Sequence, residues 1–260
     1  MVWLKGVMEM KHSEIVRIVP GADTAVLFIH GIVGTPNHFV KGIPLLELVP
    51  EGWSVYNLLL PGHGKTVEDF SRSSMKLWKE KVWSVFSQLS LTHKQIILVG
   101  HSMGTLFAIQ LALEYPEKIP FAFLLAVPLR PWIRLSGMVN CLRLAFGKIR
   151  EDHSLEVAVR NACGVKTTRK LWKYMGWIPR FLELFREIAQ TEKKMSALRV
   201  PAIAFQSEMD ELVCNRSRRI LERSGVFEIR NLKKSSHFYY HPEDAASVRT
   251  CFLKQMKKKA

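Results

Sequence analysis

The sequence lacks the motifs by which metal and nucleotide sites are usually found. It contains neither a His-Glu-x-x-His nor a Gly-x-Gly-x-x-Gly stretch, so it predicts neither a catalytic zinc nor a bound dinucleotide. Gly64-Lys65-Thr66 resembles the end of a phosphate-binding loop, but Leu59 stands where that loop needs its first glycine. We therefore expect an activity that uses no cofactor and no metal.

Cysteines and long apolar runs are scarce as well. None of the four cysteines lies in a Cys-x-x-Cys pair, a spacing that would indicate metal binding or redox exchange. We expect free, mostly buried thiols in a reducing compartment. No apolar run approaches the roughly 18 residues that span a bilayer, and the N-terminus lacks the pattern of a secretory signal. These absences predict a cytoplasmic protein without stable membrane insertion.

Acidic residues are in the minority, because 23 Asp and Glu stand against 38 Lys and Arg, a formal net charge of +15. Such an excess can indicate an anionic partner. The basic residues are scattered, however, and no zinc-finger spacing or RNA-binding motif accompanies them. We expect no nucleic-acid partner and interpret the charge as favouring solubility. The sequence leaves the oligomeric state open.

The patterns that are present alternate between strands and helices. The chain has 260 residues, 48% of them hydrophobic, which is enough for a sizeable core. Continuous apolar runs, typical of strands covered on both faces, alternate with helical periodicity. This predicts an α/β fold with a doubly wound, mostly parallel sheet. The strand candidates are 15–19, 25–29, 54–60, 95–99, 121–127, 202–205 and 226–232, and the helix candidates are 75–91, 103–115, 216–224 and a final helix from Pro242.

One stretch interrupts the alternation. From about residue 128 to 197 there is no strand candidate but several helical patterns, so we expect a helical insertion between two halves of a core, 1–127 and 198–260. Each aromatic residue of the insertion could be an ordinary core residue, but as a group over an active site they would line an apolar cleft. These residues are Trp132, Phe146, Trp172, Trp177, Phe181 and Phe185.

The strongest indication of chemistry is the pentapeptide Gly100-His101-Ser102-Met103-Gly104, which lies between a strand candidate and a helix candidate. A serine on a sharp strand-to-helix turn has a strained backbone and needs small neighbours, so that strand and helix can approach closely. The two glycines meet this need. Ser102 is therefore predicted to be a catalytic nucleophile.

An activated serine needs a base, and that base needs a carboxylate to fix its tautomer. Asp210 and His237 each come directly after a strand candidate, where a loop at the edge of the sheet would present them. They are our choice for the acid and the base. The rivals are the acids Glu208 and Glu211 and the base His241, whereas His63 and His101 are expected to be structural.

The negative charge that forms on the substrate oxygen during acyl transfer needs preorganised N–H donors. Met103, directly after the nucleophile, is one candidate donor. The second is expected in the loop after strand candidate 25–29, where Gly31 lets the backbone approach closely. Ile32 is our choice for it.

In these residues the sequence resembles the α/β-hydrolase family, and within it the bacterial carboxylesterases and monoacylglycerol lipases. The resemblance implies a helical cap, or lid, between the sixth and seventh strands, corresponding to 128–197, and ester hydrolysis without a cofactor. The similar motifs are His30-Gly31 with Gly34-Thr35-Pro36, Leu60-Pro61-Gly62-His63-Gly64, the Ser102 pentapeptide, Tyr115-Pro116-Glu117-Lys118, Asp210 with Val213, and His237.

The sequence therefore predicts a serine carboxylester hydrolase that cleaves a small acyl or aryl ester, monoacylglycerol-like or short-chain, through Ser102, His237 and Asp210. A thioesterase, or another hydrolase with the same three residues, is an alternative. A catalytically silent binding protein with this fold is another, because fold alone does not fix function. No triad position is lost in the sequence, which argues against the silent protein.

Overall fold

The computed structural model describes residues 12–131, 150, 152–214 and 216–259. Seven strands form one sheet in the order β1-β3-β2-β4-β5-β6-β7. Strand β1 runs antiparallel to β3, and the other neighbouring pairs are parallel. The predicted α/β class and mostly parallel sheet are confirmed. The strands are β1 Ile15–Arg17, β2 Thr24–Ile29, β3 Ser54–Asn57, β4 Gln95–His101, β5 Ala122–Leu125, β6 Ala202–Ser207 and β7 Phe227–Leu232.

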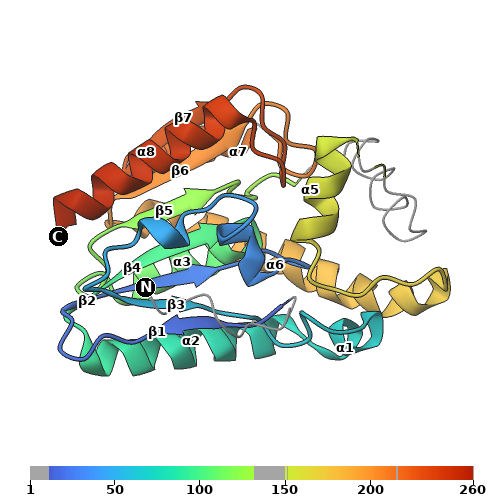
Figure 1. The fold of residues 1–260 in the computed structure, drawn as a ribbon, viewed down its shortest axis with the longest axis horizontal. Coiled ribbons are helices and arrows are strands. Elements are labelled where there is room, and N and C mark those ends of the chain that lie inside the picture. The colour runs from blue at the N-terminus through green and yellow to red at the C-terminus, as the bar shows by residue number, and fades with distance from the viewer. Residues whose placement is uncertain (1–11, 132–149, 151, 215, 260) are drawn as a thin grey trace.

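Helices lie on both sides of this sheet (Figure 1). Helices α2 and α3 pack with one core cluster, and α8 packs with the other. The short helix α1 was not predicted. The α-helices are α1 Val67–Arg72, α2 Met75–Thr92, α3 Met103–Glu114, α5 Ser154–Ala162, α6 Ile178–Lys194, α7 Arg216–Ser224 and α8 Pro242–Lys259, and the 3₁₀ helices are η1 Pro36–Phe39, η2 Leu46–Leu48, η3 Leu171–Trp177 and η4 Met195–Ala197.

Strand β2 shows why its sequence is continuously apolar. Successive side chains of a strand point to opposite faces of the sheet. Ala25, Leu27 and Ile29 join the core that includes α2 and α3, whereas Val26 and Phe28 join the core that includes α8. Both faces are therefore buried, as expected for a central parallel strand.

The described part of the segment between β5 and β6 contains the helices α5, η3, α6 and η4, joined by irregular stretches, and no strand of the sheet. Counted along the described residues, this segment follows the fifth strand, not the sixth as the resemblance implied, because β1 is the one described strand that precedes the parallel strands. Of its aromatic residues, Trp177 and Phe181 pack against the core. Trp172 is 69% exposed and Phe185 is also exposed, so the expected single aromatic cleft is not formed by these two. Trp132 and Phe146 lie outside the described residues.

Gly164 joins this helical segment to the loop after β2. Its N–H donates to the Val33 carbonyl at 2.7 Å, and its own carbonyl accepts the N–H of Gly64. A Cβ at Gly164 would lie 1.9 Å from the carbonyl oxygen of Gly34. Only glycine allows the two backbones to approach this closely.

Among the described residues, no helix is long and apolar enough to cross a bilayer. The three described cysteines, Cys163, Cys214 and Cys251, form no disulfide, and of these three Cys251 is fully buried. Cys141 lies outside the described residues. The expectation of mostly buried thiols is therefore met at one of the three positions seen.

Candidate active site

Ser102 occupies the turn between β4 and α3. Its backbone has φ 51° and ψ −124°, a left-handed region that costs a residue with a side chain on the order of 1–3 kcal/mol. Two hydrogen bonds hold this conformation. The Ser102 N–H donates to the Leu125 carbonyl at 2.9 Å, and the Ser102 carbonyl accepts the Thr105 N–H at 2.9 Å. The side chain is thereby presented at the end of the strand, and the residue is 8% exposed.

The two glycines that flank this turn are needed for close packing. A Cβ at Gly104 would lie 2.1 Å from the Ile29 carbonyl oxygen, and a Cβ at Gly100 would lie 2.8 Å from the Thr105 Cα. Neither position can accept a larger residue without displacing backbone. The structure thus gives both glycines the role that the sequence predicts for them.

Asp210 and His237 form a buried pair on neighbouring loops, after β6 and β7 respectively. The Asp210 Oδ2 atom lies 2.8 Å from His237 Nδ1, and the two residues are 3% and 2% exposed. The other oxygen of Asp210 accepts the N–H groups of Leu212 and Val213, both at 2.8 Å. The carboxylate is therefore fixed, and the imidazole that donates to it from Nδ1 has Nε2 free to accept a proton.

The environment of His237 favours its charged form. Burial disfavours the imidazolium, but the charge and hydrogen bond of Asp210 oppose this effect, and the net result is a raised pKa of His237. This is the direction required of a base that must hold a proton during a reaction.

The rival residues predicted from the sequence occupy different places. Glu208 is exposed, and Glu211 is buried but accepts the backbone N–H of His237 rather than its ring N–H. The backbone N–H of His241 donates to the Ser235 hydroxyl. Among the described residues, Asp210 is thus the acid hydrogen-bonded to a histidine ring at this site.

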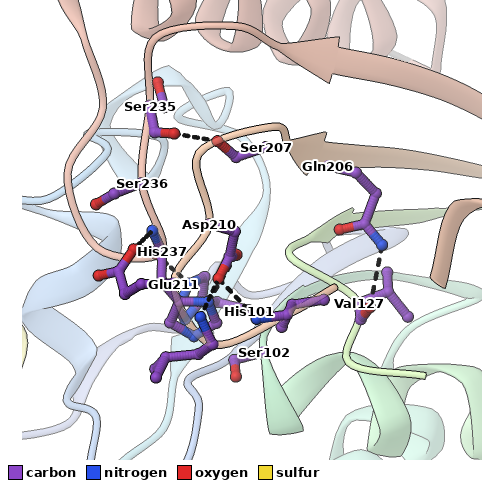
Figure 2. Close-up of polar contacts among 12 residues, drawn as sticks. His101, Ser102, Val127, Gln206, Ser207, Asp210, Glu211, Ser235, Ser236 and His237 are labelled. Atoms are coloured by element: carbon purple, nitrogen blue, oxygen red, sulfur yellow. Dashed lines mark hydrogen bonds and ion pairs between the residues drawn. The ribbon is translucent and has the colours of Figure 1, made fainter. Parts of the chain in front are cut away.

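His101 connects the serine turn with the histidine loop, as Figure 2 shows. Its Nε2 atom lies 3.1 Å from the His237 carbonyl oxygen, and since a carbonyl only accepts, Nε2 carries the hydrogen. The structure contains no hydrogen bond between the Ser102 hydroxyl and the His237 ring. Such bonds are often long in enzymes without substrate and tighten in the complex.

Two further histidines lie in this region: His30, which the sequence offers only as part of the His30-Gly31 motif, and His38, which the sequence reasoning did not identify. The His38 ring stacks on His101 with ring centroids 3.7 Å apart, and His30 Nε2 accepts the Leu60 N–H at 3.1 Å. Burial is the main cause that lowers the pKa of His38 to about 3 and that of His30 to about 4. Both rings are therefore neutral near pH 7 and pack without adding charge. No local sequence signal distinguishes His38.

The two predicted oxyanion donors lie on segments that meet at Ser102. Met103 begins α3, and Ile32 lies in the loop after β2, where a Cβ at Gly31 would be 2.8 Å from the Ser102 Cβ. The N–H of the next residue, Val33, is bound by His63 Nε2 at 3.1 Å. Within the described part of the chain, neither the Ile32 nor the Met103 N–H has a hydrogen-bond acceptor, so both are available to a ligand.

The acidic and histidine side chains of the site bind to one another and to backbone. The described residues contain no group of three or more His, Cys, Asp or Glu side chains arranged to hold a metal ion. The chemistry that the arrangement can perform from its own residues is nucleophilic and acid–base.

Known lipolytic enzymes are similar to this chain in sequence and in fold. Over 210 residues the chain is 29% identical to the thermostable monoacylglycerol lipase of Bacillus sp. (strain H-257), a match that covers 77% of this chain and 79% of the relative. The fold is similar to that of a structure from work on LipS and LipT, two metagenome-derived lipolytic enzymes, with a TM-score of 0.71, 18% identity, and coverage of 95% of this chain and 98% of that chain. It is also similar to the Paleococcus ferrophilus monoacylglycerol lipase, with a TM-score of 0.64, 19% identity, and the same coverage of 95% and 98%.

A family model describes most of the chain. The model for serine aminopeptidase, S33, matches residues 20–241, a range that contains the serine turn, the loop after β2, and the Asp210–His237 pair. The protein therefore belongs to the serine aminopeptidase S33 family of α/β-hydrolases.

Proposed function

We propose that the protein is a serine carboxylester hydrolase with Ser102 as nucleophile, His237 as general base and acid, and Asp210 as the orienting carboxylate. The observation that carries the proposal is the buried Asp210–His237 hydrogen bond of 2.8 Å beside a serine held at positive φ. We further propose that residues 128–197 act as a cap on a core formed by 1–127 and 198–260.

In the proposed reaction, the Ser102 oxygen attacks the ester carbonyl while His237 Nε2 takes the hydroxyl proton. The Ile32 and Met103 N–H groups bind the oxyanion of the tetrahedral intermediate. His237 returns the proton to the departing alcohol, which leaves an acyl group on Ser102. Water, deprotonated by His237, then attacks the acyl carbonyl; the bond between the acyl group and Ser102 Oγ breaks, His237 returns the proton to Oγ, and the acid leaves. Asp210 stabilises the imidazolium in both halves without becoming protonated.

The substrate is proposed to be a small acyl or aryl ester, monoacylglycerol-like or short-chain. The names of the curated relative and of a structural neighbour, both monoacylglycerol lipases, support an ester in preference to the alternatives. A thioester is a second substrate class for the same three residues, and an amide is a third, which the name of the family, serine aminopeptidase, supports.

A substrate panel tests the bond that is cleaved. We expect purified protein to hydrolyse p-nitrophenyl esters, with an optimum at one acyl length, faster than matched thioesters and far faster than aminoacyl p-nitroanilides. A fluorophosphonate probe should label one residue, Ser102, as identified by peptide mass spectrometry. Faster cleavage of the thioesters or anilides would reassign the substrate, and an unlabelled Ser102 in folded protein would favour the silent binding protein.

The pH dependence follows from the environment of His237. The free enzyme needs neutral His237 as its base, and the Asp210 carboxylate overcomes burial to raise the pKa of His237 above the ordinary 6.5. Activity should therefore be lost as the pH falls through that raised value. We expect the acid-side midpoint of kcat/KM, measured on a p-nitrophenyl ester at constant ionic strength, to lie above pH 6.5. A midpoint below that value would contradict the assigned ion pair.

A further inference from the structure

The catalytic histidine is bound by two neighbouring carboxylates, not one. Glu211 directly follows Asp210, is only 5% exposed, and accepts the backbone N–H of His237 at Oε2 over 3.0 Å. Figure 2 shows Glu211 beside His237, with this contact drawn. From the sequence, Glu211 is only a rival to Asp210 for the acid, and the proposed reaction gives its contact with the His237 backbone no role.

Together these contacts hold His237 at three points. Asp210 binds the ring at Nδ1, Glu211 binds the backbone N–H, and His101 binds the backbone carbonyl. The other titratable groups acting on the site are neutral rings at neutral pH, since burial lowers the pKa values of His38 and His101 and raises that of Tyr240. Among the described residues, the charges that act on His237 are therefore those of Asp210 and Glu211.

A carboxylate at this position is costly to the fold. Burial, and to a smaller extent the charge of Asp210, raise the pKa of Glu211, while the charge and N–H of His237 act in the opposite direction. A glutamine would accept the same backbone N–H through its amide oxygen without a buried charge. The hydrogen bond alone therefore does not explain why an ionisable group is present.

We propose that Glu211 is a positioning residue for His237: it fixes the main chain of the histidine, and its negative charge stabilises the imidazolium that forms during catalysis. The second part rests on the proposed function, whereas the effect on the histidine itself does not. No bond to Glu211 forms or breaks in the reaction. Its charge acts over a short distance inside a buried site, where electrostatic interactions are stronger than in water.

The test is Glu211→Gln, which keeps the hydrogen-bond acceptor and removes the charge. The pKa of His237 is measured by NMR on the imidazole nitrogens, a readout that needs no turnover. We expect it to fall by about one unit, with about a tenfold loss in kcat, little change in KM, and an acid limb of kcat/KM displaced to lower pH. The matched control is Glu208→Gln, which makes the same charge change on the same loop at an exposed position.

A third variant separates charge from anchoring. Glu211→Ala removes the negative charge and the hydrogen bond to the His237 backbone, and we expect it to lower the melting temperature and the activity more than Glu211→Gln does. Glu211→Gln should have a melting temperature near that of the wild type but a lowered pKa of His237. An unchanged His237 pKa in folded Glu211→Gln, or an equal shift in Glu208→Gln, would overturn the proposal. If wild-type protein hydrolyses no ester while Glu211→Gln still lowers the His237 pKa, the proposed function fails and the role of Glu211 in tuning the histidine stands.

Discussion

Ser102→Ala is expected to lower kcat on a p-nitrophenyl ester by roughly 10⁵–10⁶-fold, because removing the nucleophile of a serine triad abolishes the covalent route. Folding should be intact. The Ser102 hydroxyl has no hydrogen bond to any described residue, and alanine faces the same positive φ that serine already adopts. Steady-state kinetics beside circular dichroism and a thermal melt would measure both expectations.

Ser196→Ala is the matched control for this change. Ser196 is exposed in η4, away from the catalytic loops, and its variant should retain the full rate and react with the fluorophosphonate probe. Retention of even a tenth of the wild-type rate by folded Ser102→Ala, freed of contaminating esterase, would refute a serine mechanism at this residue.

Asp210→Asn is expected to lower kcat by about 10⁴-fold with little effect on KM. The amide oxygen can replace Oδ1 and accept the Leu212 and Val213 N–H groups. The amide nitrogen, however, only donates, so it pairs with an unprotonated Nδ1 and moves the imidazole hydrogen to Nε2. That tautomer cannot take the proton of Ser102.

The tautomer can be observed directly. In wild-type protein the hydrogen on His237 Nδ1 should give a proton resonance shifted far downfield, and this resonance should be lost in Asp210→Asn. An activity within tenfold of the wild type, with the resonance retained, would mean that another acid supplies the contact. Glu208→Asn, an exposed position on the same loop, controls for the loss of one charge.

Local signals explain why much of the fold and site could be predicted. Each candidate site segment can be recognised from residue types within a few positions of a strand end. These segments are the serine turn after β4, the glycine loop after β2, and the loops with the acid and the base after β6 and β7. Even α1, which was missed, has such a signal: Thr66 and Asp69 form a capping box, with the Thr66 N–H donating to Asp69 over 3.1 Å. Its short length, Val67–Arg72, gives little helical periodicity to detect.

Contacts between distant segments could not be predicted in this way. The bond from Glu211 to His237 spans 26 positions, and that between His101 and His237 spans 136, so no local pattern encodes either. The packing partners of the aromatic residues in 128–197 could not be predicted from the sequence either. Helical periodicity predicts a helix but does not tell which neighbour its apolar face will meet, and Trp172 remains exposed.

The contact of Gly164 with the loop after β2 limits how the 128–197 segment can be exchanged between members of this family. Gly164 forms backbone hydrogen bonds with Val33 and Gly64 and lies in close contact with Gly34. A chimera in which a foreign segment replaces 128–197 would therefore change one side of this contact and keep the other. The side that is kept includes Val33 and Gly34, which directly follow Ile32. We therefore expect such a chimera to fold as the parent does only when residues 31–35 are exchanged together with 128–197, with the crossover points placed in the strands on either side of each range.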